Sequence, residues 1–273
     1  MLKGGTRPPP LPAVAETPAP TLSLEQYEAY TPIVVVRDGA VEVAYCTPNR
    51  MTKMRADTLF SKEPHTIEWI RGFEAGEVLL DIGANVGMYS IWAAKTRGVR
   101  VFAFEPESQN FALLYKNIIF NQLGSLVTGY CAALADREEV SLLHLSHFQA
   151  GGSCHTFGES LDFNLKEYRF SHTQGCFSTT VDDLVTRGVL PVPNHIKIDV
   201  DGLEHKVLAG CRRTLEDRRL RSVLVEINTR LPEHLRIVEN MKALGFHWSE
   251  NQVATAMRHE GPFTGIGNHV FER

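Results

Sequence analysis

The stretch Val78-Leu-Leu-Asp-Ile-Gly-Ala-Asn-Val-Gly87 decides the fold of this chain of 273 residues. An apolar run followed by an acid and a glycine-rich turn is typical of a buried parallel strand that leads into the N-terminus of a helix. The dinucleotide fingerprint requires glycine where Asn85 and Met88 stand, so the spacing disfavours an NAD-dependent oxidoreductase. The turn and Asp81 instead suit an adenosine ligand that bears an amino acid and lacks a pyrophosphate, because an acid favours its cationic groups.

From residue 78 onward, apolar strand patterns alternate with helical patterns, which predicts parallel β-α-β units and a doubly wound sheet. The expected strands are 78–82, 101–104, 127–133, 140–145, 195–200, 222–227, 247–249 and 269–271, and the expected helices are 88–96, 108–121, 181–187, 204–216 and 233–244. The stretch 149–176 shows no clear periodicity and is expected to be a long loop. Ligands of such sheets bind at the carboxyl ends of the strands, so the site is expected there.

The chain is expected to have three parts. Residues 1–22 contain six prolines and no apolar period, which predicts a flexible Pro-rich tail. Residues 23–76 are expected to form an extension, with a β-hairpin over 33–45 and a helix over 57–72. Residues 77–273 form the main domain.

Composition and charge disfavour several classes of protein. The net charge of -4 argues against a dedicated nucleic-acid-binding protein, which usually has a basic face. The five cysteines contain no Cys-x-x-Cys pair, which predicts free thiols in a reducing compartment. No apolar run of about 18 residues occurs, which predicts no membrane span, and a cytoplasmic location is the default expectation.

Two further strand ends offer groups for a nucleoside. The strand 101–104 is followed by Glu105 and Pro106, and an acid at this position can accept hydrogen bonds from two ribose hydroxyls. Small residues near Ala133 and Leu134 would admit an adenine ring and leave backbone groups free to bond it.

The fourth main strand leads into Asp199, followed by Asp201 and Glu204. Acids gathered at one strand end are costly to desolvate together, so such a cluster is more often functional than accidental. Asp199 is the candidate to orient an acceptor hydroxyl or to act as its general base. Asp201 and Glu204 can also simply cap the next helix. The three acids could hold a divalent cation, but no metal site is assigned.

Two histidines are further catalytic candidates. His155 lies in the 149–176 stretch, which is expected to contact the acceptor because a long irregular loop in a compact domain is commonly functional. Its imidazole could act as a base near neutral pH. His205 follows the fourth main strand and is the second candidate.

These motifs, taken in order, resemble those of the FkbM-type methyltransferases over about residues 63–230. The matching pieces are Asp81-Ile-Gly-Ala-Asn-Val-Gly-Met-Tyr-Ser90, Phe104-Glu-Pro106 with Asn110, Asn117 and Asn121, Thr180-Val-Asp-Asp-Leu184, Lys197-Ile-Asp-Val-Asp-Gly-Leu-Glu204, and Glu226 in Val225-Glu-Ile227. Asp201 stands where the family usually has Glu, a change that keeps the charge.

The resemblance implies a Rossmann-like class I methyltransferase fold with a doubly wound, mostly parallel sheet of seven strands. It also implies methyl transfer from S-adenosyl-L-methionine to a hydroxyl of a sugar or secondary metabolite, with S-adenosyl-L-homocysteine as the product. The expected cofactor contacts are Asp81, Gly83, Ala84, Asn85, Gly87, Tyr89, Ser90, Glu105, Pro106, Asn110, Ala133, Leu134 and Asp199.

The expected partner is a small-molecule or glycan acceptor and not a nucleic acid, and a homo-oligomer stays open. Two alternatives are a catalytically silent cofactor-binding scaffold and an RNA methyltransferase. The presence of every expected strand-end residue disfavours the first. The acidic balance and the lack of a basic, aromatic-interleaved patch disfavour the second.

Overall fold

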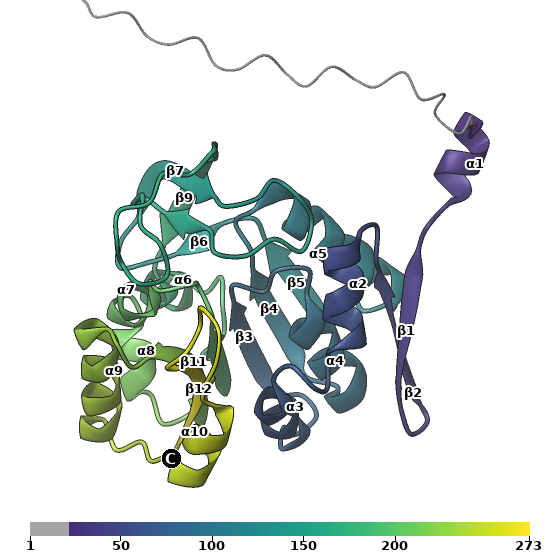
Figure 1. The fold of residues 1–273 in the computed structure, drawn as a ribbon. Helices are drawn as coiled ribbons and strands as arrows, with labels where there is room; N and C mark the ends of the chain where they lie inside the picture. Colours follow the sequence, from purple (N-terminus) through teal and green to yellow (C-terminus); the bar gives the residue numbers. More distant parts are fainter. Residues whose placement is uncertain (1–21) are drawn as a thin grey trace, which may run out of the picture. The chain divides into compact units, whose positions relative to one another are not determined.

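The computed structural model describes residues 22–273 (Figure 1). The Pro-rich tail predicted over 1–22 therefore lies outside the described residues except for Leu22. Contacts divide the chain into two units, of which the structure describes residues 22–31 and 32–273. In the first unit, helix α1 (Leu24–Ala29) begins at a capping box made by Ser23 and Gln26. Among the described residues, no helix combines the length and apolar character that a membrane crossing requires.

The second unit is built on a six-stranded sheet of order β12-β11-β10-β3-β4-β5 (Figure 1). Its strands are β3 (Val78–Ile82), β4 (Arg100–Phe104), β5 (Val127–Tyr130), β10 (His195–Ile198), β11 (Ser222–Asn228) and β12 (Ile266–Glu272). Neighbouring strands are parallel except β12, which runs antiparallel to β11. The chain winds outward from β3 in both directions, so the predicted Rossmann-like, mostly parallel sheet is confirmed.

The sheet has six strands where seven were expected. The expected strand at 247–249 is reduced to a single bridge between His247 and Glu272. Helix α10 (Glu250–Ala256) starts directly afterwards, at its N-cap Ser249, so few residues remain to pair. The expected strand 127–133 also stops at Tyr130, and the next strand of the chain joins another sheet.

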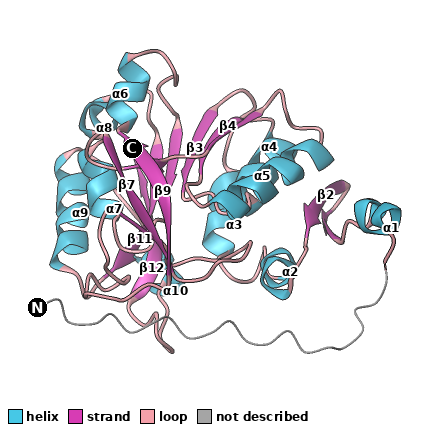
Figure 2. Ribbon diagram, turned by 90° about the horizontal axis from the view of Figure 1, so that it is seen from above, coloured by secondary structure: helices cyan, strands magenta, loops and turns pink. Residues whose placement is uncertain are grey.

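Helices cover both faces of the main sheet (Figure 2). One face packs against α3 (Pro64–Arg71), α4 (Met88–Arg97) and α5 (Ser108–Phe120), and the other against α6 (Val181–Thr186), α7 (Glu204–Ala209), α8 (Arg212–Glu216) and α9 (Pro232–Ala243). Successive residues of β3 alternate between the two cores, with Leu79 in the first and Leu80 in the second. Each fully buried side chain of this kind stabilises the fold by roughly 1.5–3 kcal/mol.

Two expected helices differ in the structure. The helix expected over 57–72 is shortened to α3, because Pro64 starts the helix at its first position, and a separate helix α2 (Arg50–Asp57) precedes it where none was expected. The helix expected over 204–216 breaks at Gly210. The carbonyl of Gly210 accepts a hydrogen bond from the amide of Asp182, and a side chain at Gly210 would collide with the carbonyl oxygen of Ala135.

The predicted hairpin is formed by β1 (Ile33–Asp38) and β2 (Val41–Cys46). The side chain of Asn121 bonds both the amide and the carbonyl of Ala44, at 2.9 and 2.7 Å. Asn117 accepts a hydrogen bond from the amide of Cys46 at 2.8 Å. These two asparagines of α5 and its C-cap therefore attach the hairpin to the helices, within one compact unit.

A second sheet has the order β6-β9-β7-β8. Its strands are β6 (Ala133–Leu134), β7 (Glu139–Leu145), β8 (Thr156–Phe157) and β9 (His172–Thr179). The stretch expected to be one loop over 149–176 thus contains β8 and the start of β9. The sequence of β9 has no buried residue before Ser178, which explains why its pattern lacks the apolar alternation of a half-buried strand.

Candidate active site

The turn between β3 and α4 packs against two neighbouring elements. A side chain at Gly83, whose φ is 80°, would collide with the carbonyl oxygen of Asp199 at the end of β10. A side chain at Gly87, whose φ is 82°, would collide with Leu114 of α5. Glycine at both positions therefore lets the turn lie directly beside Asp199.

Asp81 lies beneath this turn and is buried. Ser90 donates a hydrogen bond of 2.6 Å to its Oδ2, and the Nζ of Lys197 lies 3.8 Å from its Oδ1. Burial raises the pKa of Asp81 above its ordinary value, although Lys197 and Ser90 oppose this change. Asp81 and Ser90 do not line the two cavities described next, so they support the turn from below.

A cavity, here called the main cavity, lies between the second sheet and the carboxyl ends of β3, β4 and β10. Leu143 of β7 and Phe157 of β8 form its far wall. The predicted site residues that line it are Gly83, Asn85, Glu105, Pro106, Asn110, Ala133, Leu134, His155 and Asp199. The structure therefore brings together residues that lie as far apart in the sequence as Gly83 and Asp199.

Glu105 is held at the edge of the main cavity by backbone amides. Its Oε2 accepts a hydrogen bond from Asn85 at 2.8 Å, and its Oε1 accepts one from Glu107 at 2.8 Å. Burial raises the pKa of Glu105 to about 7. Each oxygen keeps a second lone pair, so the carboxylate can still accept hydrogen bonds from a ligand.

The backbone of residues 150–154 forms another wall and is held by five side chains from four parts of the chain. Gly152 and Ser153 line the main cavity within this segment. The contacts are Asn49 Nδ2 to Ala150 O (2.8 Å), Arg55 Nε to Gly151 O (2.8 Å), Asn85 Nδ2 to Gly152 O (2.6 Å), Asn110 Nδ2 to Gly152 O (3.1 Å), Gly151 N to Asn110 Oδ1 (2.7 Å), and Cys154 N to Asp201 Oδ2 (2.7 Å). Asp201, which lies three residues after the end of β10, thus positions this segment.

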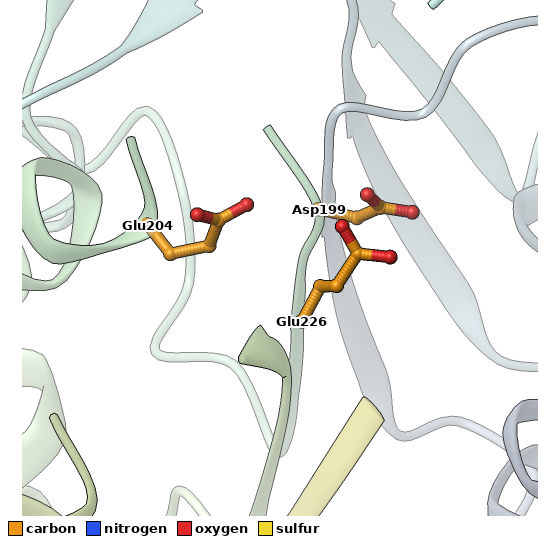
Figure 3. A group of neighbouring side chains, drawn as sticks. All are labelled: Asp199, Glu204 and Glu226. Carbon is orange, nitrogen blue, oxygen red and sulfur yellow. The ribbon is translucent and has the colours of Figure 1, made fainter. Parts of the chain in front are cut away.

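Asp199, Glu204 and Glu226 form a group of carboxylates (Figure 3). One oxygen from each lies within 4.8 Å of the others, so among residues 22–273 these three form the group that could hold a cation. Protein donors already bond all three. The donors are Lys197 Nζ to Asp199 (3.2 Å), the amides of Val200 and Gly202 to Glu204 (2.9 and 3.0 Å), and Arg258 Nη1 to Glu226 (3.0 Å).

Lys197 is buried between the turn and the acids. Burial alone would lower the pKa of Lys197, but the negative charges of Asp199 and Asp81 outweigh this effect and raise the pKa above its ordinary value. The ammonium therefore stays charged and fixes one oxygen of Asp199. It also lies over the ring of Tyr89, 5.4 Å from the centroid.

A second cavity, here called the side cavity, lies between α2 and the N-terminus of α4. It shares Gly83, Asn85 and Asp199 with the main cavity. Two more predicted cofactor residues, Ala84 and Tyr89, line it rather than the main cavity. The two cavities therefore adjoin along the turn and Asp199.

A family model described as the methyltransferase FkbM domain matches residues 81–248, more than half of the chain. The chain belongs to the FkbM methyltransferase family. The matched range includes the turn, the strand ends and the residues that the two cavities share.

Two FkbM-family relatives and one solved structure illustrate the similarity. The chain is 28% identical over 159 residues to the hexuronic acid methyltransferase AglP of Haloferax volcanii, covering 57% of each chain. It is 28% identical over 184 residues to the 31-O-demethyl-FK506 methyltransferase FkbM of Streptomyces tacrolimicus, covering 56% of this chain and 66% of that one. The chain thus spans less than two thirds of either relative. The METTL16 MTase domain matches with 12% identity and a TM-score of 0.48, over 87% of this chain and 86% of that one.

The two candidate histidines of this FkbM-family chain lie in different places. The Nδ1 of His155 accepts a hydrogen bond from the amide of Ser146, so its ring proton is on Nε2. Nε2 is buried without a partner among residues 22–273, and burial lowers the pKa of His155 to about 4. In this tautomer the Nε2 of His155 is a hydrogen-bond donor, and the role of His155 as a base stays a prediction. His205 lines a separate groove beside α9, away from both cavities.

Sequence reasoning missed one charged residue of a cavity wall and two charged residues that bond residues of the site. Arg55 lines the side cavity, and Arg258 links Glu226 to Glu63, at 3.0 and 3.3 Å. Glu63 also accepts a hydrogen bond from Tyr89 at 2.9 Å. No motif surrounds these residues, so only their three-dimensional placement identifies them.

Proposed function

We propose that this chain transfers a methyl group from S-adenosyl-L-methionine to a hydroxyl oxygen of a sugar or secondary metabolite. The main support is the placement of the glycine turn, Glu105 and Asp199 on one cavity at the carboxyl ends of the strands. A nucleoside fits there with its ribose at Glu105 and its base near Ala133 and Leu134.

The groups of the main cavity fit this cofactor, which supplies a methyl group on a positively charged sulfur. An ionised Glu105 accepts hydrogen bonds from two ribose hydroxyls. Asp199 and its neighbouring acids lower the free energy of a cation nearby. The Nε2 proton of His155, which has no protein acceptor among the described residues, is available to a ligand oxygen or nitrogen.

Asp199 is the proposed catalytic residue. Lys197 bonds its Oδ2 at 3.2 Å, and this contact fixes the carboxylate between the two cavities. The remaining acceptor capacity of Asp199 can bind the acceptor hydroxyl, align its oxygen and take its proton as the bond to carbon forms.

The relatives' names support an oxygen acceptor on a small molecule or glycan. One name specifies a hexuronic acid, and the other a 31-O-demethyl compound. The absence of a nucleic-acid partner, a homo-oligomeric state and a cytoplasmic location remain proposals from the sequence.

Calorimetric titration with S-adenosyl-L-methionine, S-adenosyl-L-homocysteine and NAD tests the proposal. We expect binding of both sulfur nucleosides and none of NAD. A screen of hydroxylated sugars for production of S-adenosyl-L-homocysteine then tests the acceptor class. Binding of NAD alone, or of neither sulfur nucleoside, would contradict the proposed cofactor.

A further inference from the structure

Among residues 22–273, the wall of the side cavity contains one cation, Arg55, that forms no ion pair. Lys62 and Lys197, the other cations of its wall, are paired with Glu63 at 3.0 Å and Asp199 at 3.2 Å. Arg55 has no carboxylate oxygen within 4 Å anywhere in residues 22–273, and only its Nε is bonded to the protein there. Its two terminal nitrogens are therefore available to an anion.

Arg55 is held in place for such a contact. It is half-buried on α2, and its Nε donates to the carbonyl oxygen of Gly151 at 2.8 Å. This bond fixes one edge of the planar guanidinium and leaves the other edge free. A partly desolvated guanidinium without a counter-ion is unfavourable, and a carboxylate that bonds it in two places relieves this cost.

The N-terminus of α4 adds a second preference for negative charge in the same cavity. This helix has ten residues, no side-chain cap and no acid in its first turn. Its first residues, Met88 and Tyr89, line the side cavity. Their free amides and the helix dipole favour an anion at this end.

We propose that the side cavity binds the carboxylate of the cofactor's amino-acid end and that Arg55 is its ion-pair partner. This inference rests on the proposed function. A ligand with its ribose at Glu105 reaches the side cavity across Gly83 and Asp199, which both cavities share. Its ammonium then lies on the side of Asp199 and its carboxylate on the side of Arg55, so each charge meets an opposite one.

The test compares two ligands that differ by one carboxylate. They are S-adenosyl-L-homocysteine and 5′-deoxy-5′-(3-aminopropylthio)adenosine, which keeps the amine and lacks the carboxylate. Both are titrated into the parent chain and into the Arg55→Met, Arg55→Lys and Arg50→Met variants. Arg50 is an exposed arginine of the same helix outside the side cavity and serves as the matched control.

We expect Arg55→Met to weaken S-adenosyl-L-homocysteine by about tenfold or more, because a charge-assisted contact is lost. The affinity of Arg55→Met for the amine ligand should equal that of the parent. The affinity of Arg55→Lys for S-adenosyl-L-homocysteine should lie between those of the parent and Arg55→Met, and Arg50→Met should bind both ligands as the parent does. Equal losses for both ligands would assign Arg55 a purely structural role and overturn the inference, as would unchanged affinity for both. A parent chain that binds neither ligand would instead contradict the proposed function itself.

Discussion

The turn over 83–87 and the 150–154 segment face the same cavity but are built in opposite ways. The turn is specified locally: Ser90 lies 9 residues from Asp81, and Glu105 lies 20 residues from Asn85. The side chains that hold the 150–154 segment lie 41 to 101 residues away from their partners. A short motif therefore reveals the first region, whereas only the folded chain reveals the second.

The two regions also differ in what contacts a ligand. In the turn, small residues let the backbone approach, and acids at the strand ends supply charge. In the 150–154 segment, side chains from distant parts of the chain bond the backbone. The segment itself offers no side chain that is an obvious base. We therefore expect substitutions at the strand ends to change turnover and cofactor affinity. Substitutions that release the 150–154 segment are expected to change how well that segment is ordered.

The largest expected effect is that of Asp199→Asn. Loss of the carboxylate should lower kcat by about 10²- to 10⁴-fold, the range of general acid–base catalysis, with a much smaller change in S-adenosyl-L-homocysteine affinity. Because Lys197 loses a charged partner, the melting temperature should also fall. Asp57→Asn, an exposed acid of α2, is the control. Parent-like turnover in Asp199→Asn would remove it from the mechanism.

The next effect concerns Glu105, whose pKa burial raises to about 7. The ionised form accepts the ribose hydroxyls, so affinity for S-adenosyl-L-homocysteine should rise by roughly tenfold between pH 6 and pH 8. Glu105→Gln should bind more weakly and show a flatter profile. Calorimetry across this range gives the answer, and a Gln variant with the parent's pH dependence would assign the titration to another group such as Asp201.

The same shift has a consequence for stability with a defined sign. A carboxyl whose pKa is higher in the folded state binds its proton more tightly there, so its stabilising contribution is lost as pH rises from its ordinary 4.5 through 7. The melting temperature of the parent should therefore fall more between pH 5 and pH 8 than that of Glu105→Gln. The difference in melting temperature between variant and parent should thus shift in favour of Glu105→Gln at pH 8. This stability gain would accompany weaker cofactor binding.

The sequence predicts the parts of the fold in which pattern and burial coincide. Strands β3 and β4 are mainly apolar, whereas β10 and β11 also contain polar residues. All four are almost entirely buried because helices cover both sides of the sheet, and residues at their carboxyl ends identify Asp81, Glu105 and Asp199. Strand β9 is largely uncovered and escaped prediction. Arg55 also escaped, because an arginine on a short helix has the same local pattern whether it faces solvent or a cavity. The proton position of His155 depends on the amide of Ser146, which no spacing rule includes.

A smaller effect is expected from Asn110→Ala, which releases one end of the 150–154 segment. Two hydrogen bonds are lost, to the amide of Gly151 and the carbonyl of Gly152. At about 1 kcal/mol for each, amide exchange in the segment should accelerate by roughly tenfold or more, while the turn over 83–87 is unchanged. Hydrogen-exchange mass spectrometry measures both, with exposed Asn240→Ala as control. Equal acceleration in both regions would show that they open as one unit.

The smallest effects separate the two histidines. His155→Gln replaces the Nε2 donor with an amide donor, so turnover should fall only a few-fold and the pH–rate profile should keep its shape. A base with a pKa near 4 would instead define the acid limb of the profile, and that limb would vanish in the variant. His205→Gln should leave turnover and cofactor affinity at the parent's values, because its groove lies away from both cavities. If His205→Gln abolished turnover while His155→Gln did not, the acceptor would have to enter from the α9 side, and the 150–154 segment would no longer define the acceptor wall.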